Sequence, residues 1–286
     1  MASELIGEYI ARLLAAPGGY RPLVRTPGGR VAGNFYKAQL ASVFQPIVGR
    51  DEAVVGHEAF VRSYTEDATA LSPWQVFAGA ASDEELVRLD RLCRTVHAIN
   101  YFASASAAAR LFLGVEARLL SAVESDHGRV FGRVLTSFGE SAKRVVIQLP
   151  ATVNRNTVLV GHVIANYRHC GYGVAMTLRP GDAAAFEHVA LFRPDFVRLR
   201  ATDHAGSELH DVVQRVHAAG ALALVSHIET ADQLMGARDA GADLVQGYYL
   251  GHPAPQPQPH RRDDPKPAGY PWSDDTALPH VHAVPK

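Results

Sequence analysis

The chain has 286 residues, of which 47% are hydrophobic, and 28 Lys and Arg balance 29 Asp and Glu to a formal net charge of −1. Such a balance supplies no bulk electrostatic attraction for nucleic acid or for an anionic membrane surface. No apolar run approaches the roughly 18 residues of a membrane span, and no signal-peptide pattern opens the chain. The two cysteines, Cys93 and Cys170, lack the C-x-x-C spacing of redox and zinc sites, which predicts a reduced, cytoplasmic protein.

Residues 1–38 are predicted to form an N-terminal extension of one helix and a loop. Apolar residues recur at helical spacing from Leu5 to Leu14, and Pro17-Gly18-Gly19 ends that helix. Residues 20–38, interrupted again by Pro27-Gly28-Gly29, are predicted to be loop. The apolar stripe of the helix either covers the core of the same domain or offers a surface to a partner.

Residues 39–252 alternate between short β-rich runs and helix-length stretches, a pattern typical of a parallel sheet. The eight β-rich runs are 43–48, 54–62, 111–115, 144–149, 172–178, 196–200, 221–226 and 244–246. Longer helical stretches, among them 84–102, 153–169, 205–219 and 231–240, separate the later runs. Only residues 49–53 divide the first two runs, which is too short for a parallel crossover. The predicted fold is therefore an α/β, TIM-like (β/α)8 barrel with an antiparallel first strand.

The last part of the chain differs in composition from the barrel. From Gly251 onward Pro, His and Asp replace the apolar periodicity. A segment with so few apolar residues cannot form a core of its own, so residues 253–286 are predicted to be a disordered tail.

Motifs at both ends of the predicted barrel resemble the EAL family. The opening hairpin reads Phe44-Gln45-Pro46-Ile47-Val48 and then Gly56-His57-Glu58-Ala59-Phe60-Val61-Arg62, similar to the family signature Glu-Ala-Leu-x-Arg. The closing segments Ile228-Glu229-Thr230, Asp243-Leu244-Val245-Gln246-Gly247 and Pro253-Ala254-Pro255 follow in the family's order. The resemblance implies a bacterial signalling domain with this barrel fold. Active members of the family hydrolyse cyclic di-GMP with two divalent cations at the C-terminal mouth of the barrel.

The resemblance also assigns metal ligands to the strand ends, and this chain has lost most of them. Glu58 matches a metal-binding Glu of the family, and Glu229 is retained. Where the family has an Asn, this chain reads Leu113-Gly114-Val115, and Gln148 stands in place of a second Glu. Thr177-Leu178 replaces the bridging Asp pair, Arg198 replaces the catalytic Lys, and Ser226 replaces a further Glu. Arg198 cannot replace the Lys as a base, because a guanidinium stays protonated. We therefore expect no Mg²⁺ or Mn²⁺ cofactor.

The side chains of Glu58, Gln148, Arg198, Ser226 and Gln246 are expected to meet at one mouth of the barrel. Arg198 and Arg200 are two residues apart on a strand, so both are expected to face the mouth and make it attractive to anions. The residues that would contact a ligand there are Gln45, Pro46, Glu58, Arg62, Arg198, Arg200, Glu229, Gln246 and Pro253. Two alternatives to a ligand-binding role stay open. In the first, Glu58 pairs with Arg198 or Arg200 in a structural salt bridge. In the second, Gln45 and Arg62 only stabilise the hairpin.

Three functions follow from these residues, and the first is preferred. It is a catalytically inactive EAL-like domain that regulates cyclic di-GMP-related pathways by binding an unidentified protein partner. The alternative is a receptor that binds cyclic di-GMP without metal, using Arg62, Arg198 and Arg200 on its phosphates. A residual phosphodiesterase comes last. Neither nucleic acid nor a membrane is expected as a partner, and a homodimer is left open.

Overall fold

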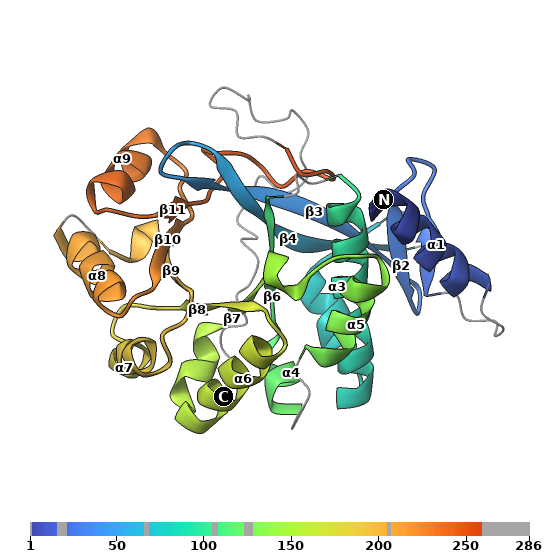
Figure 1. Ribbon diagram of the computed structural model, residues 1–286, viewed down its shortest axis with the longest axis horizontal. Coiled ribbons are helices and arrows are strands. Elements are labelled where there is room, and N and C mark those ends of the chain that lie inside the picture. Colours follow the sequence, from blue (N-terminus) through green and yellow to red (C-terminus); the bar gives the residue numbers. More distant parts are fainter. Residues whose placement is uncertain are drawn as a thin grey trace.

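The computed structural model describes residues 2–15, 22–65, 69–104, 108–122, 128–204 and 207–258. Eight strands close into a ring (Figure 1). In order around the ring they are β3 (Ala38–Gly49), β11 (Leu244–Val245), β10 (Leu222–Ser226), β9 (Phe196–Arg200), β8 (Gly173–Thr177), β7 (Val145–Leu149), β6 (Arg110–Gly114) and β4 (Val54–Thr65). β3 runs antiparallel to β4 and to β11, and the other neighbours are parallel. The predicted barrel with an antiparallel first strand is confirmed.

Helices surround the ring and cover its outer surface (Figure 1). They are α2 (Pro73–Ala78), α3 (Asp83–Phe102), α4 (Ala117–Ala122), α5 (Arg129–Ser137), α6 (Thr157–His169), α7 (Ala183–Phe192), α8 (Ser207–Ala218) and α9 (Ala231–Asp239). Short 3-10 turns are η1 (Ala142–Arg144), η2 (Ala151–Arg155) and η3 (Ala201–Asp203). Side-chain caps fix several helix starts: Ser82 caps α3, and Thr230 forms a capping box with Gln233 at α9.

The N-terminal region departs from the prediction of a loop over residues 20–38. β1 (Leu23–Arg25) and β2 (Val31–Phe35) form a hairpin, and β2 extends the sheet beyond β3. Pro27-Gly28-Gly29 is the turn of this hairpin, because the Gly29 N–H donates to the Thr26 carbonyl and Gly29 has a φ of 77°. The amide of Asn100 on α3 binds both backbone groups of Val31, which ties the hairpin to the barrel.

Helix α1 (Ala2–Ala15) is present as predicted, and the middle of its apolar stripe faces the protein itself. Ile6 and Ile10 are buried in the main core, and the ring of Tyr9 meets the ring of Phe138 edge-on. This part of the stripe therefore covers the core of the domain, which is the first of the two readings that the sequence left open.

The interior of the barrel is closed by an apolar layer to which most strands contribute one side chain. Its members are Ile47, Phe112, Val146, Ala175, Phe196, Leu224 and Leu244. On β4 the matching position is Gly56, where an added Cβ would lie 2.5 Å from the Arg110 carbonyl oxygen and 2.9 Å from the Phe112 ring. This layer forms a floor, so polar side chains of the next layer lie on one side of it.

The start of the predicted tail packs on the barrel. Ala254 pairs with Phe44 of β3 through two backbone hydrogen bonds, and the His57 ring contacts the Gln258 carbonyl oxygen at 2.9 Å. Residues 253–258 thus belong structurally to the barrel, whereas residues 259–286 lie outside the described residues. Within the part that is described, no helix has the length and apolar character needed to cross a membrane.

Candidate functional site at the barrel mouth

A layer of polar side chains lies directly above the apolar floor. Side chains two residues apart on a strand point to the same face, so the residue two positions from each floor residue also faces the interior. The sequence places the following residues in this second layer: Gln45, Glu58, Gly114, Gln148, Thr177, Arg198, Ser226 and Gln246. Except on antiparallel β3, these positions lie toward the C-terminal ends of the strands, which is the mouth where barrels of this type build their sites.

Glu58 is the centre of a hydrogen-bonded cluster in this layer. Its Oε1 accepts from Gln148 Nε2 at 2.8 Å and from the Arg198 guanidinium at 2.9 Å, and its Oε2 accepts from Gln246 Nε2 at 2.8 Å. The cluster is cross-linked, because Arg198 also donates to Gln148 Oε1 at 3.1 Å and Gln246 donates to Gln45 Oε1 at 3.1 Å. Five strands or strand ends are thereby joined across the barrel interior.

The charge of Glu58 is compensated within this cluster. The side chains of Arg198 and Glu58 are only 9% and 7% exposed, so their ion pair is little screened by water. Burial is the largest influence on the pKa of Glu58 and raises it. The charge of Arg198 and the hydrogen bonds from Arg198, Gln246 and Gln148 outweigh burial, and the pKa lies below its usual value. Glu58 is therefore an ionised carboxylate whose two oxygens already accept hydrogen bonds from N–H donors.

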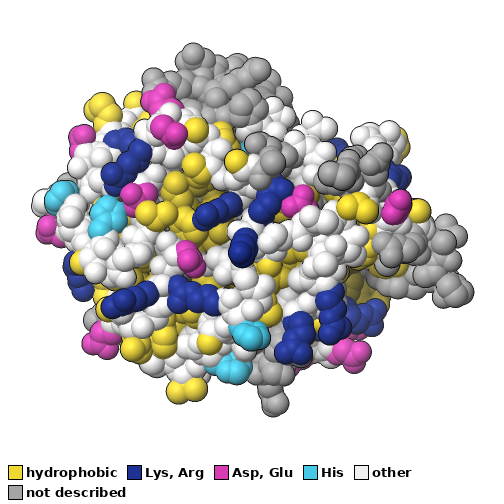
Figure 2. Space-filling model, viewed as in Figure 1, with side chains coloured by type: hydrophobic (Ala, Val, Ile, Leu, Met, Phe, Trp, Pro, Cys, Tyr) yellow, Lys and Arg dark blue, Asp and Glu magenta, His cyan; other side chains and the backbone are white. Residues whose placement is uncertain are grey.

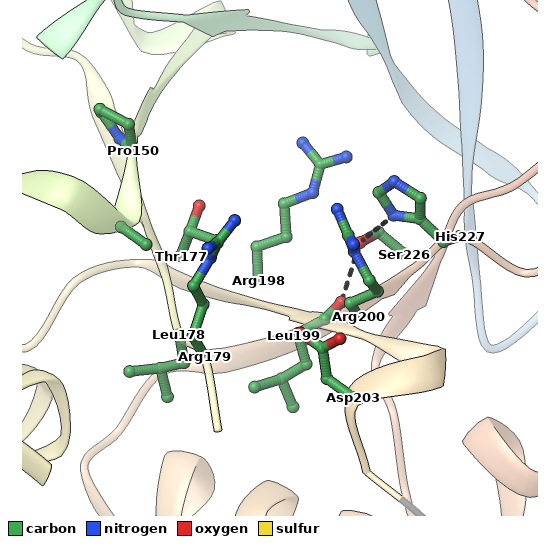
Figure 3. Close-up of a pocket in the computed structure, with 11 residues that line it drawn as sticks. Pro150, Thr177, Leu178, Arg179, Arg198, Leu199, Arg200, Asp203, Ser226 and His227 are labelled. Atoms are coloured by element: carbon green, nitrogen blue, oxygen red, sulfur yellow. Dashed lines mark hydrogen bonds between the residues drawn. The ribbon is translucent and has the colours of Figure 1, made fainter. Parts of the chain in front are cut away.

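A small pocket lies beside the cluster, at the ends of β8, β9 and β10 (Figure 3). Its lining includes Pro150, Thr177, Arg179, Arg198, Arg200, Asp203, Ser226 and His227. Figure 3 shows the side chains of Arg179, Arg198 and Arg200 extending toward the same opening. The backbone of His227 has a φ of 61°, a left-handed conformation uncommon outside glycine, and its ring nitrogen lies 3.1 Å from Ser226 Oγ.

The structure brings together most of the residues expected at the mouth. Glu58, Gln148, Arg198, Gln246 and Gln45 form the cluster, and the hydroxyl of Ser226 lines the pocket while donating to the Leu199 carbonyl. The open question of which arginine pairs with Glu58 is decided in favour of Arg198. Both arginines line the pocket, but only Arg198 also belongs to the cluster, so the two have different surroundings.

The remaining predicted residues lie around the cluster rather than in it. Pro46 is buried, and a Cβ added at Gly251 would meet its ring at 2.8 Å. Pro253 is buried beside the same segment, and Arg62, half-buried on β4, donates to the Val61 carbonyl at 3.5 Å. Glu229 is exposed at the start of α9, where its backbone N–H donates to Gln233, so its carboxylate does not join the Glu58 cluster.

Three lining residues with ionisable side chains were not among the predicted site residues: Arg179, Asp203 and His227. A signal for each existed in the sequence, since each lies within three residues of the C-terminal end of a strand. The lining contains three arginines and one acidic residue. Among the described residues, no three His, Cys, Asp or Glu side chains are grouped so that they could hold a metal ion.

Comparisons with known proteins agree with the fold. The uncharacterized EAL-domain containing protein YkuI of Bacillus subtilis (strain 168) is 26% identical over 225 residues, which are 74% of this chain and 54% of YkuI. This chain therefore spans about half the length of that relative. The crystal structure of YkuI with cyclic di-GMP and calcium matches with a TM-score of 0.66 and 21% identity, covering 77% of this chain and 57% of YkuI.

Two further structures resemble the chain at similar levels. BlrP1 of Klebsiella pneumoniae, in a complex with calcium and cyclic di-GMP, gives a TM-score of 0.65 and 18% identity, covering 75% of this chain and 56% of BlrP1. A standalone EAL protein of Vibrio cholerae O395 in its cyclic di-GMP-bound form gives 0.63 and 17%, covering 77% and 94%. A family model described as EAL domain matches residues 31–253, which include every strand of the barrel. This chain therefore belongs to the EAL domain family.

Proposed function

We propose that this chain is a catalytically inactive EAL domain that acts in cyclic di-GMP-related signalling by binding a protein partner. The observation that carries the first half of the proposal is the buried ion pair between Glu58 and Arg198 at 2.9 Å. A guanidinium occupies the space next to the one acidic side chain of the cluster. Two-metal hydrolysis of a phosphodiester requires cations at about that place, held by several oxygen ligands.

The donor set does not fit Mg²⁺ or Mn²⁺. Each Glu58 oxygen accepts from an N–H group, and Gln148 Oε1 accepts from Arg198. Gln246 Oε1 is buried without a hydrogen-bond donor, but it is a single neutral oxygen. A hard divalent cation needs about six oxygen ligands, with carboxylates among them, to offset its dehydration. A cation bound at Glu58 would also have to displace Arg198, so these residues do not fit a metal-dependent mechanism.

Exposed apolar side chains on the outer helices support the second half of the proposal. Val158 on α6 is 83% exposed and Leu191 on the neighbouring α7 is 65% exposed. Figure 2 shows apolar side chains at the lower edge of the molecule, over these two helices. Contiguous apolar patches on a surface are typical of protein-binding sites, and we propose that these two side chains belong to one.

A metal-independent cyclic di-GMP receptor is the second candidate. It is favoured by the arginines that line the mouth pocket, because Arg binds phosphate oxygens by charge-assisted hydrogen bonds. The related structures of YkuI and BlrP1 contain cyclic di-GMP together with metal ions. A receptor of the present kind would have to bind the same class of ligand with cationic side chains alone.

The proposal is tested with purified protein and cyclic di-GMP at millimolar Mg²⁺ or Mn²⁺. We expect no linear dinucleotide above a control without protein. The proposal of inactivity fails if product appears and is abolished by Glu58→Ala, because a contaminating enzyme would not respond to that substitution. For the partner, proteins captured by the wild type are compared with those captured by the double variant Val158→Ser, Leu191→Ser. Binding of cyclic di-GMP in EDTA that is lost in Arg200→Ala favours the receptor instead.

A further inference from the structure

Two arginines of the mouth pocket have no partner that would explain their placement. Arg179 follows β8 and Arg200 ends β9, and both line the pocket. Within the described part of the chain, neither guanidinium takes part in a hydrogen bond or an ion pair. Arg198 differs, because Glu58 and Gln148 accept its hydrogen bonds. The cationic groups that remain available to a ligand are therefore those of Arg179 and Arg200.

The charge around the pocket is unbalanced. Three arginines contribute positive charge, Arg198 is compensated by Glu58, and Asp203 is the one acidic residue of the lining. One positive charge is left over. The pKa of Arg179 lies below its ordinary value, first because of burial and next because of the charge of Arg200, while Asp203 acts in the opposite direction. Two like charges held this close repel each other, and an anion between them would remove that repulsion.

We propose that Arg179 and Arg200 form a binding site for the phosphoryl group of a nucleotide or for free phosphate, without a metal ion. Planar guanidinium groups match the oxygens of a phosphoryl group with two parallel hydrogen bonds. The pocket beside them has a volume of about 40 Å³, which suits a group of a few atoms and is far below the roughly 300 Å³ of a site that encloses a whole small molecule. The rest of a nucleotide would lie in the open mouth.

The inference rests on the proposed function in one respect, namely that no metal ion occupies the mouth. It differs from the receptor hypothesis in the arginines that contact the phosphate. Arg198, which the sequence offered as a phosphate contact, already neutralises Glu58, and Arg179, which was not a predicted site residue, takes its place. Removing Arg198 would disturb the buried cluster, whereas removing Arg179 or Arg200 removes only the proposed site.

Calorimetric titration of the full chain in EDTA tests the site with three probes: cyclic di-GMP, GMP and inorganic phosphate. We expect at least one probe to bind, and Arg179→Ala and Arg200→Ala each to weaken its binding by about tenfold or more, the usual effect of losing a hydrogen bond to a charged group. Arg133→Ala, on the exposed side of α5, is the matched control and should leave the affinity unchanged. Asp203→Asn removes the opposing carboxylate and should tighten binding.

The three probes distinguish the sources of the phosphoryl group. Binding of inorganic phosphate and GMP identifies a free or terminal phosphate, and binding of cyclic di-GMP alone identifies the phosphodiester of the dinucleotide. Because an alanine variant could disturb the fold, Arg179→Lys and Arg200→Lys are measured as well. They keep the charge but not the paired hydrogen bonds, so their affinities should lie between those of the wild type and the alanine variants.

Two results would overturn the inference. The first is that the wild type binds none of the probes in EDTA, and the second is that affinity is the same in both alanine variants and in Arg133→Ala. The absence of binding together with the absence of hydrolysis rejects this site and leaves the proposed function standing. Binding that appears only after Mg²⁺ is added counts against the site and against the metal-free mouth together.

Discussion

Replacing Arg198 by alanine leaves the Glu58 carboxylate buried without its cation. The two side chains are 9% and 7% exposed and lie 2.9 Å apart, so solvent screening takes away little of their interaction. Removing one partner of a buried ion pair costs about 3–5 kcal/mol. Gln148 and Gln246 still donate to Glu58 after the substitution. We therefore expect a loss near the lower end of this range, about 3 kcal/mol at pH 7.

The loss should depend on pH in a direction that follows from the pKa of Glu58. In the wild type the folded-state pKa lies below 4.5, so the stabilisation by the pair is present above the unfolded pKa and is lost as the pH falls through the folded pKa. In Arg198→Ala burial becomes the dominant influence and raises the pKa of Glu58. Protonation then relieves the variant as the pH falls, and the gap to the wild type should narrow from pH 7 to pH 5.

Urea unfolding of both proteins at pH 7 and pH 5 measures these differences, provided that the slopes of the two transitions agree. The matched control is Arg118→Ala, because Arg118 pairs with Asp83 at 2.8 Å on the surface, where the side chains are 46% and 60% exposed. This control should cost no more than about 1 kcal/mol. The reasoning is refuted if Arg198→Ala costs no more than Arg118→Ala, or if the gap widens at pH 5.

Two further predictions concern residues outside the Glu58 cluster. His97 is buried against Ser42, and burial, helped by the charge of Arg94, lowers its pKa to about 3. The unfolded chain therefore binds a proton below about pH 6.5 that the folded chain does not, and the free energy of unfolding should fall by about 1.4 kcal/mol per pH unit below that value. Urea midpoints at pH 7 and pH 5 should show a smaller fall in His97→Gln, and an equal fall would contradict this origin. Gly247→Ala should destabilise the protein by about 3 kcal/mol or more, because the new Cβ would lie 2.0 Å from a backbone oxygen. The control is Gly236→Ala, in a helix where a new Cβ would have nothing within 4 Å, and this variant should be slightly more stable than the wild type. Similar shifts of the thermal unfolding midpoint in both variants would rule out the steric argument.

Much of the fold could be read from local patterns along the chain. The eight β-rich runs and the short link at residues 49–53 determine a barrel with one antiparallel strand, because a five-residue link cannot make a parallel crossover. Period-two alternation also determines that Glu58, Gln148 and Arg198 face the interior. The β1–β2 hairpin was not predicted, because β2 contains Gly33 and Asn34, residue types that are depleted in strands. The Pro27-Gly28-Gly29 sequence of its turn is equally typical of a loop.

The partner choices at the mouth were decided by tertiary structure alone. Arg198 and Arg200 share a strand face, so alternation could not say which of them meets Glu58, 140 residues away from Arg198. The stagger of the closed barrel puts Glu58 and Arg198 in the layer directly above the apolar floor, and Arg200 one layer higher, beside Arg179. Only the deeper arginine is close enough to neutralise the carboxylate. Arg200, which is nearer to the surface, remains beside Arg179. Which strand ends come into contact depends on closure of the ring and not on spacing in the sequence.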